Sequence, residues 1–176
     1  MHDTAVIDRV PTMGDITVRA ATQADEHVLR DIYASTRADE LAQLDWTLEQ
    51  KAWFVGMQFD AQHRHYVEHY PDAAFLVIER DGVPVGRLYL HEQPTEVRIM
   101  DIALLPEARG LGIGTTLLRQ VIADAAARGQ AVSIHVEDRN PARQLYERLG
   151  FTPVEIRGVY TLMEIRPAPH DGAARA

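Results

Sequence analysis

The sequence predicts a single domain of the α/β class, an α+β sandwich in which one mixed sheet carries helices on its faces. Three observations support this fold class. The length of 176 residues fits one domain. Short runs with alternating apolar residues are interspersed with runs of helical period, and turn-forming residues separate them. The expected element order is β-α-α-β-β-β-α-β-α-β-β, over residues 16–166.

The composition excludes several classes of function. The chain has no cysteine, so disulfides, thiolate metal sites and cysteine nucleophiles are ruled out. A formal net charge of −8 disfavours nucleic acid as a partner. The chain lacks an apolar run long enough for a membrane span, and its start lacks the apolar run of a secretory signal, so we expect a cytoplasmic protein. Residues 1–15 and 167–176 show no period and are expected to be flexible.

Local signals place the boundaries of the expected elements. Thr47 and Gln50 form a capping-box pattern at the start of the second helix. The pair Asp81-Gly82 is a strong signal for a hairpin turn, and Gly129 ends the third helix. The strands are expected at 16–19, 74–80, 84–91, 96–105, 131–136, 151–157 and 159–166, and the helices from residue 22, at 47–71, at 115–129 and at 140–149.

A glycine-rich loop, RGLGIG, follows the strand at 96–105 and precedes the third helix. Glycines let a backbone approach a ligand closely, and the free N–H groups of a helix start form a phosphate cradle, to which Arg109 adds a charge. The spacing G-x-G-x-G differs from the dinucleotide fingerprint and from the P-loop. The alternative is a tight connection between strand and helix that binds nothing.

In this context the sequence resembles the GNAT superfamily of acyl-CoA-dependent N-acetyltransferases. The run IALLPEARGLGIGTTLL resembles the family's pyrophosphate-binding motif, and NPARQLYERLGF resembles its second acyl-CoA motif. The two motifs stand in the family's order, separated by one helix and one strand. The resemblance covers about residues 16–166 and implies the GNAT fold, a central mixed, mostly antiparallel sheet with helices on both faces.

The resemblance also implies acetyl-CoA as the co-substrate, no metal, and a set of residues that hold the co-substrate. The strand at 96–105, called the motif strand below, would pair with pantetheine through its backbone. The amides of the glycine loop would bind the pyrophosphate. Arg143 is equally compatible with a solvated surface position. The implied residues are Ile102, Ala103, Leu104, Arg109, Gly110, Leu111, Gly112, Ile113, Gly114, Thr115, Asn140, Arg143 and Tyr146.

Tyr146 is expected to be the partner of the leaving thiolate. A tyrosine has a pKa near 10 and a thiol one near 8.5, so full proton transfer would cost about 2 kcal/mol. Tyr146 is therefore expected to stabilise the thiolate by hydrogen bonding as much as by protonating it. The alternative for Tyr146 is a core aromatic residue.

The general base is left open among three residues. His135 stands five residues before Asn140, where some family members carry an acid, and a histidine can accept a proton at physiological pH. A structural histidine is the alternative. Other members place the base on the motif strand, where Glu96 and Asp101 are candidates for a base or the end of a water relay, and each is also compatible with a salt bridge.

Strict alternation along the motif strand assigns its side chains to two faces. Arg98 shares the face of Glu96 and is a candidate for binding a substrate carboxylate, or else a plain surface arginine. One face is expected to hold Glu96, Arg98, Met100, Ile102 and Leu104, and the other Val97, Ile99, Asp101 and Ala103.

Aromatic residues gather between positions 33 and 70, where family members form one wall of the acceptor site. Core packing explains most of these residues, and Trp46 is the best candidate for a substrate contact. The run from His65 to His69 matches the H-x-x-E-H pattern of one metalloprotease group. Because the sequence supplies no identifiable third ligand, we expect a solvated helix face there.

The sequence therefore predicts an N-acetyltransferase that moves an acetyl group from acetyl-CoA to a primary amine of a small molecule by direct attack in a ternary complex. Two alternatives stay open. One is an enzyme that acetylates a protein or peptide N-terminus or a lysine, and the other is an acyl-CoA-binding sensor without activity. The sequence predicts neither a nucleic-acid nor a membrane partner, and it is compatible with a homodimer.

Overall fold

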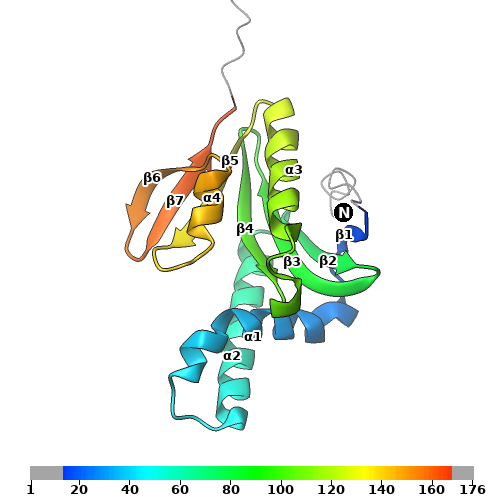
Figure 1. Ribbon diagram of the computed structural model, residues 1–176, viewed down its shortest axis with the longest axis vertical. Helices are drawn as coiled ribbons and strands as arrows, with labels where there is room; N and C mark the ends of the chain where they lie inside the picture. The colour runs from blue at the N-terminus through cyan, green and yellow to red at the C-terminus, as the bar shows by residue number, and fades with distance from the viewer. Residues whose placement is uncertain (1–13, 168–176) are drawn as a thin grey trace, which may run out of the picture.

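Seven segments with strand patterning pair into one sheet in the computed structural model, which describes residues 14–167 (Figure 1). The strand order is β1-β2-β3-β4-β5-β7-β6, and helices cover both faces, so the expected fold is confirmed. The strands are β1 (Ile16–Ala20), β2 (Ala74–Arg80), β3 (Val83–Glu92), β4 (Glu96–Leu104), β5 (Ala131–Glu137), β6 (Thr152–Arg157) and β7 (Tyr160–Ile165). The helices are α1 (Glu26–Ala42), α2 (Leu48–His69), α3 (Ile113–Ala127) and α4 (Arg143–Arg148), with short 3₁₀ turns η2 (Gln23–Asp25) and η3 (Pro106–Ala108).

The sheet is mixed but mostly antiparallel. Among the described strands only β4 and β5 run parallel, and α3 makes the crossover between them. Parallel neighbours need such a crossover, whereas antiparallel neighbours can be joined by a short turn. Between β2 and β3 the turn is Asp81-Gly82, with φ values of 52° and 75°. Two positive φ angles in succession are the requirement of a type I′ turn, which confirms the predicted hairpin.

Apolar side chains divide between the two faces of the sheet. The larger core lies between the sheet and helices α3 and α4, and it includes Leu117 and Met163. The smaller core lies under α1 and α2 and includes Ile32 and Phe59. Figure 1 shows α3 and α4 on the near side of the sheet, with the α1–α2 pair reaching beyond its lower end.

Side chains define the starts of the first two helices. At Thr22 the chain enters a 3₁₀ turn before α1 begins at Glu26. The buried Asp25 accepts two hydrogen bonds of 2.8 Å from Arg19, and this pairing lowers the pKa of Asp25 well below its ordinary value. Thr47 caps α2 through the predicted capping box, because its Oγ accepts from the N–H of Gln50 at 3.2 Å.

Within residues 14–167 we find no helix with the length and apolar character needed to cross a membrane. The flexibility expected at residues 1–15 and 167–176 concerns positions most of which lie outside the described residues.

Candidate functional site

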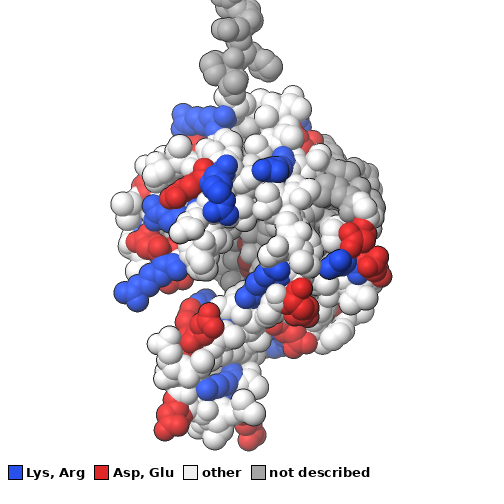
Figure 2. All heavy atoms as spheres, viewed as in Figure 1, with Lys and Arg blue, Asp and Glu red and all other residues white. Residues whose placement is uncertain are grey.

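Strands β4 and β5 separate along their length and leave a gap in the sheet. Their parallel pairing is confined to residues 96–99 of β4 and 131–134 of β5. Beyond this point, residues 102–104 of β4 pair with β3 only. On the side of β5, Ile102, Ala103 and Leu104 have no strand partner, which leaves room for an added extended chain such as the expected pantetheine arm, and the carbonyl oxygen of Leu104 there accepts from Arg109. In Figure 2 the surface is hollowed near this gap, with charges of both signs around it.

A bulge in β4 corrects the face assignment made from alternation. Tyr89 of β3 pairs with Asp101, but the next residue of β3 pairs with Ile99, so Met100 is an extra residue. Such a bulge shifts the alternation by one position. Ile102 and Leu104 consequently pack on the same core as Val97 and Ile99. The expectation that Asp101 lies opposite Glu96 was wrong, because both point to the side of α1 and α2.

The glycine loop ends in the N-terminus of α3. Gly110 and Gly112 have φ values of 73° and 81°, and Gly112 is the N-cap of the helix. A Cβ added at either glycine would have no atom within 4 Å, so crowding does not require glycine there. The positive φ angle does, because other residues rarely adopt it. The helix begins at Ile113, two residues earlier than expected, which places Gly114 and Thr115 in its first turn. The N–H groups of a helix's first turn lack intrahelical partners, the feature on which the predicted phosphate cradle depends.

Arg109 connects this loop to the first helix. Its Nε donates to the carbonyl oxygen of Leu104 at 2.8 Å, and its Nη2 donates to Oγ of Ser35 in α1 at 3.0 Å. The positive charge therefore remains beside the loop, as predicted, but much of the hydrogen-bonding capacity of Arg109 is used to hold α1. Sequence spacing carried no signal for the contact with Ser35.

Helix α4 is shorter than expected and begins at Arg143 rather than Asn140. The reason is local: Oδ1 of Asn140 accepts from the N–H of Ala142 at 2.9 Å and forms a turn before the helix. Arg143 forms ion pairs with Asp138 at 3.4 Å and Glu147 at 3.2 Å.

Tyr146 points from α4 into the larger core and is 4% exposed. Its ring meets that of Phe151 edge-on, with centroids 5.9 Å apart. Burial raises the pKa of Tyr146 to about 12, and the negative charge of Asp101 contributes. The structure thus places Tyr146 and Asp101 within electrostatic reach of each other, from opposite sides of the sheet near the gap.

His135 lies on β5, on the same side of the sheet as Asp101. Burial lowers the pKa of His135, and the positive charges of Arg98 and Arg157 lower it further. The negative charges of Glu96 and Glu155 raise it by smaller amounts. A lowered pKa leaves the imidazole neutral at physiological pH, the form that accepts a proton.

Glu96 and Arg98 are engaged with each other. Glu96 accepts from Oγ of the buried Ser133 and from Nε of Arg98 at 3.3 Å. Both side chains are partly exposed, at 26% and 29%. These contacts support the salt-bridge alternative for Glu96. Arg98 lies partly exposed on the side of the sheet that faces α1 and α2.

The sequence did not single out a buried polar cluster beside Asp101. Arg87 of β3 forms an ion pair with Asp101 and donates to Oε1 of Gln62 in α2 at 3.2 Å. Tyr66 and Tyr89 adjoin the cluster, their rings 6.1 Å apart. The available signal was an arginine at the centre of an otherwise apolar strand, VPVGRLYL. A charge in such a run needs a buried partner, which only the tertiary structure identifies.

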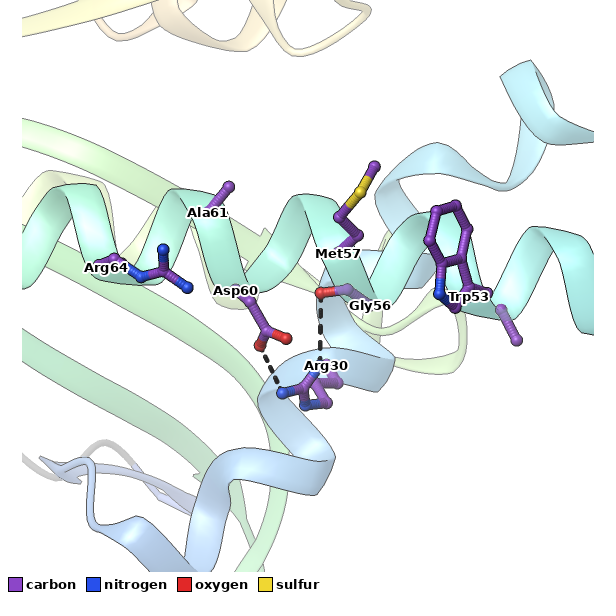
Figure 3. A pocket seen from close by; sticks show the side chains of 8 residues that line it. Arg30, Trp53, Gly56, Met57, Asp60, Ala61 and Arg64 are labelled. Carbon is purple, nitrogen blue, oxygen red and sulfur yellow. Dashed lines mark hydrogen bonds and ion pairs between the residues drawn. The ribbon is translucent and has the colours of Figure 1, made fainter.

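The aromatic residues of the first two helices fall into core and surface positions. Tyr33 and Phe59 are buried in the smaller core, as predicted for most aromatic residues between positions 33 and 70. Trp46 is 39% exposed and packs edge-on against Phe54 at 5.2 Å. Trp53 belongs instead to an open pocket of about 490 Å³ on the outside of α2, lined also by Arg30 and Asp60 (Figure 3). None of the predicted site residues lines that pocket.

The H-x-x-E-H run lies at the exposed end of α2. The rings of His65 and His69 are 4.2 Å apart, and Nδ1 of His69 is 2.9 Å from the carbonyl oxygen of His65. Their exposure fits the solvated helix face that we expected.

Strand β4 leads through the glycine loop into α3, and α3 leads to the parallel strand β5, which is the arrangement expected from the resemblance to acyl-CoA-dependent acyltransferases. The model of the acetyltransferase (GNAT) family matches residues 38–151, more than half of the chain. The chain therefore belongs to the GNAT acetyltransferase family, as its resemblance implied.

Relatives and solved structures agree with this membership. The [ribosomal protein bS18]-alanine N-acetyltransferase of Haemophilus influenzae is 30% identical over 132 residues, which cover 74% of this chain and 85% of that protein. The mycothiol acetyltransferase of Thermomonospora curvata is 31% identical over 136 residues, or 76% of this chain and 41% of that protein. The PaiA N-acetyltransferase of Thermoplasma acidophilum, solved with coenzyme A, shares the fold with a TM-score of 0.67 at 19% identity, covering 88% of this chain and 99% of that one.

Proposed function

We propose that this acetyltransferase moves an acetyl group from acetyl-CoA to a primary amine of a small molecule, in a ternary complex. One observation carries the proposal. The gap between β4 and β5 has Tyr146 on the side of α3 and α4, and His135 and Asp101 on the side of α1 and α2. A thioester that enters this gap would meet a hydrogen-bond donor on one side and a proton acceptor on the other.

The residues of this chain fit acetyl-CoA along the whole path to the gap. On the side of β5, residues 102–104 would pair with pantetheine. The N-terminus of α3 would hold the pyrophosphate, with Arg109 beside it. Asn140 and Arg143 would contact the arm or a phosphate. The proposed cradle residues are Arg109, Gly110, Leu111, Gly112, Ile113, Gly114 and Thr115.

The transfer itself needs one bond formed and one broken. Acetyl-CoA supplies an acetyl thioester. His135 takes a proton from the acceptor ammonium, directly or through one water, and the neutral nitrogen then attacks the carbonyl carbon. A C–N bond forms and the C–S bond breaks, and the electron pair leaves on the CoA sulfur. The second proton lost by the nitrogen neutralises the thiolate.

Tyr146 contributes a hydrogen bond rather than a mobile proton. Its pKa of about 12 lies about 3.5 pK units above that of an ordinary thiol, which makes full transfer uphill by roughly 5 kcal/mol. A neutral hydroxyl that donates to the developing thiolate stabilises it without paying that cost. The raised pKa thus supports a hydrogen-bonding role for Tyr146 over proton transfer.

Two relatives bear on the acceptor, and Trp46 and Arg98, both partly exposed, remain its proposed contacts. The mycothiol relative is named for a small molecule, which agrees with the leading proposal. A protein N-terminus is the second candidate, because the Haemophilus relative is named for the alanine of a ribosomal protein.

Thiol release from acetyl-CoA tests the proposal across polyamines, amino acids, arylalkylamines, aminoglycosides and basic peptides. The chain has no cysteine, so a thiol reagent reports CoA alone. Release with a small amine supports the leading proposal, and release with peptides alone favours the second. Binding of CoA without release from any amine would contradict both and favour an acyl-CoA sensor.

The pH profile tests the role of His135. Because His135 acts on the ammonium, which dominates at neutral pH for an alkylamine with a pKa near 10, log kcat/KM should be flat above the pKa of His135 and fall with slope 1 below it. Because that pKa is lowered, the break should lie below pH 6.5. His135→Asn should remove the break, and His27→Asn, an exposed change on α1, should keep it. A break that persists in His135→Asn would assign the base elsewhere.

A further inference from the structure

Arg87 is a buried cation in the middle of β3. Its side chain is 2% exposed, and its guanidinium lies over the rings of Tyr33 at 5.5 Å and Tyr89 at 5.1 Å. Nη2 of Arg87 forms the ion pair with Oδ2 of Asp101 and also donates to Gln62. Two aromatic faces, an amide and a carboxylate thus hold the guanidinium in one orientation.

Stability does not explain this arrangement. Nε and Nη1 of Arg87 and the hydroxyl of Tyr89 are buried without a hydrogen-bond partner. Unsatisfied buried donors destabilise a fold, and apolar residues of similar volume in place of a buried ion pair are often neutral or stabilising. The pair therefore needs a reason other than the free energy of folding.

Asp101 is the accessible end of the pair. Its side chain is 18% exposed, against 2% for Arg87. It directly follows the bulge at Met100, where β4 has left β5. Its charge raises the pKa values of Tyr146 and of Tyr66 in addition to the larger effect of burial, so the carboxylate lies near both hydroxyls. Oδ2 is bound to Arg87, while in the described part of the chain Oδ1 has no hydrogen-bond partner.

We propose that Oδ1 of Asp101 accepts an N–H of the attacking nitrogen and so selects primary over secondary amines, and that Arg87 is the positioning residue that aims this oxygen. The inference rests on the proposed function. A neutral primary amine carries two N–H groups. After it attacks, one is lost to the leaving thiolate while the other still donates to Asp101. A neutral secondary amine has one N–H, which must be lost, so nothing remains for Asp101 to accept.

The test compares each active primary amine with its N-methyl derivative, for example 2-phenylethylamine and L-alaninamide with their N-methyl forms. A hydrogen bond to a charged group predicts a preference of about 10- to 150-fold in kcat/KM for the primary amine. In Asp101→Asn the amide oxygen stays with Arg87 and the NH₂ faces the amine, a donor where an acceptor is needed. The preference should then fall to the level set by the bulk of the methyl group.

Three further variants separate positioning from folding. Arg87→Lys keeps the charge but loses the planar fork, so it should lower the preference without changing CoA affinity. Arg87→Met combined with Asp101→Leu leaves no unpaired charge and should fold while lacking the preference. Glu96→Gln, the matched acid on the same face, should keep the wild-type preference whatever it does to the rate. Calorimetry of the amines on the CoA complex should show the same preference without turnover.

The outcomes are distinct. Loss of the primary-amine preference in Asp101→Asn, with retention in Glu96→Gln, supports the proposal. An active Asp101→Asn enzyme with the wild-type preference overturns it and leaves the proposed function intact. A wild-type protein that releases no CoA with any amine overturns the proposed function and this inference together.

Discussion

Replacing Tyr146 by phenylalanine separates binding from chemistry at the gap between β4 and β5. The substitution removes one hydroxyl and keeps the ring, which is 4% exposed and packs on Phe151. The aromatic contact is retained, so we expect the free energy of unfolding to change by less than about 1 kcal/mol. Any effect on the reaction is then attributable to the hydroxyl.

The size of the effect follows from the charge on the leaving group. A hydrogen bond to a charged partner contributes about 1.5–3 kcal/mol, which corresponds to roughly a 10- to 150-fold loss in kcat. Because the pKa of about 12 argues against proton transfer, the loss should not reach the level expected when a general acid is removed together with its proton. CoA dissociation should change by less than about threefold, since the free thiol of CoA is neutral at pH 7.

The assay is thiol release at saturating amine, with CoA affinity measured by calorimetry in parallel. The reasoning is refuted if kcat and CoA affinity fall by the same factor, because Tyr146 would then be a binding residue. An unchanged kcat would refute it as well, since the thiolate would then have no need of the hydroxyl. His27→Asn on the exposed face of α1 serves as the control.

Three further changes test the fold that supports the site. Gly86→Ala would place a Cβ 2.6 Å from the carbonyl oxygen of Ala103 in β4, so urea unfolding should show a loss of about 1–3 kcal/mol, and an unchanged midpoint would contradict the close approach. Thr47→Ala removes the cap of α2 and should cost about 1 kcal/mol in thermal unfolding, with Thr47→Ser close to wild type. Asp25 has a pKa lowered by Arg19, so its stabilisation is present above the unfolded pKa near 4 and is lost as the pH falls further. Asp25→Asn should therefore destabilise the protein most at pH 7 and by a smaller amount at pH 2, and an equal loss at both values would exclude a charge effect.

Local signals were sufficient for most of the fold. The turn at Asp81-Gly82 and the capping box at Thr47 depend on a few consecutive residues, and the structure confirms both. The glycine loop is equally local, because its conformation follows from positive φ angles at Gly110 and Gly112. The starts of two helices moved, α3 from Thr115 to Ile113 and α4 from Asn140 to Arg143.

The candidate site depends on contacts that are remote in sequence. Alternation along β4 assigned Asp101 to the wrong face, because the bulge at Met100 exists only through the pairing of β4 with β3. The contacts of Arg87 could not be predicted from the sequence either, because its partners come from β4, α1 and α2.

The sequence by itself determined the family, the glycine loop before α3 and the candidate pair Tyr146 and His135, because each rests on residue types at short spacing. Only the tertiary structure gave a reason to propose Asp101 rather than Glu96 as the acid that joins them. Glu96 is held by Ser133 and Arg98, whereas Asp101 is turned to the gap by the bulge and oriented by Arg87. The physical reason is that strand alternation is a local rule, while a bulge and a buried ion pair are settled by neighbours that the chain meets only on folding.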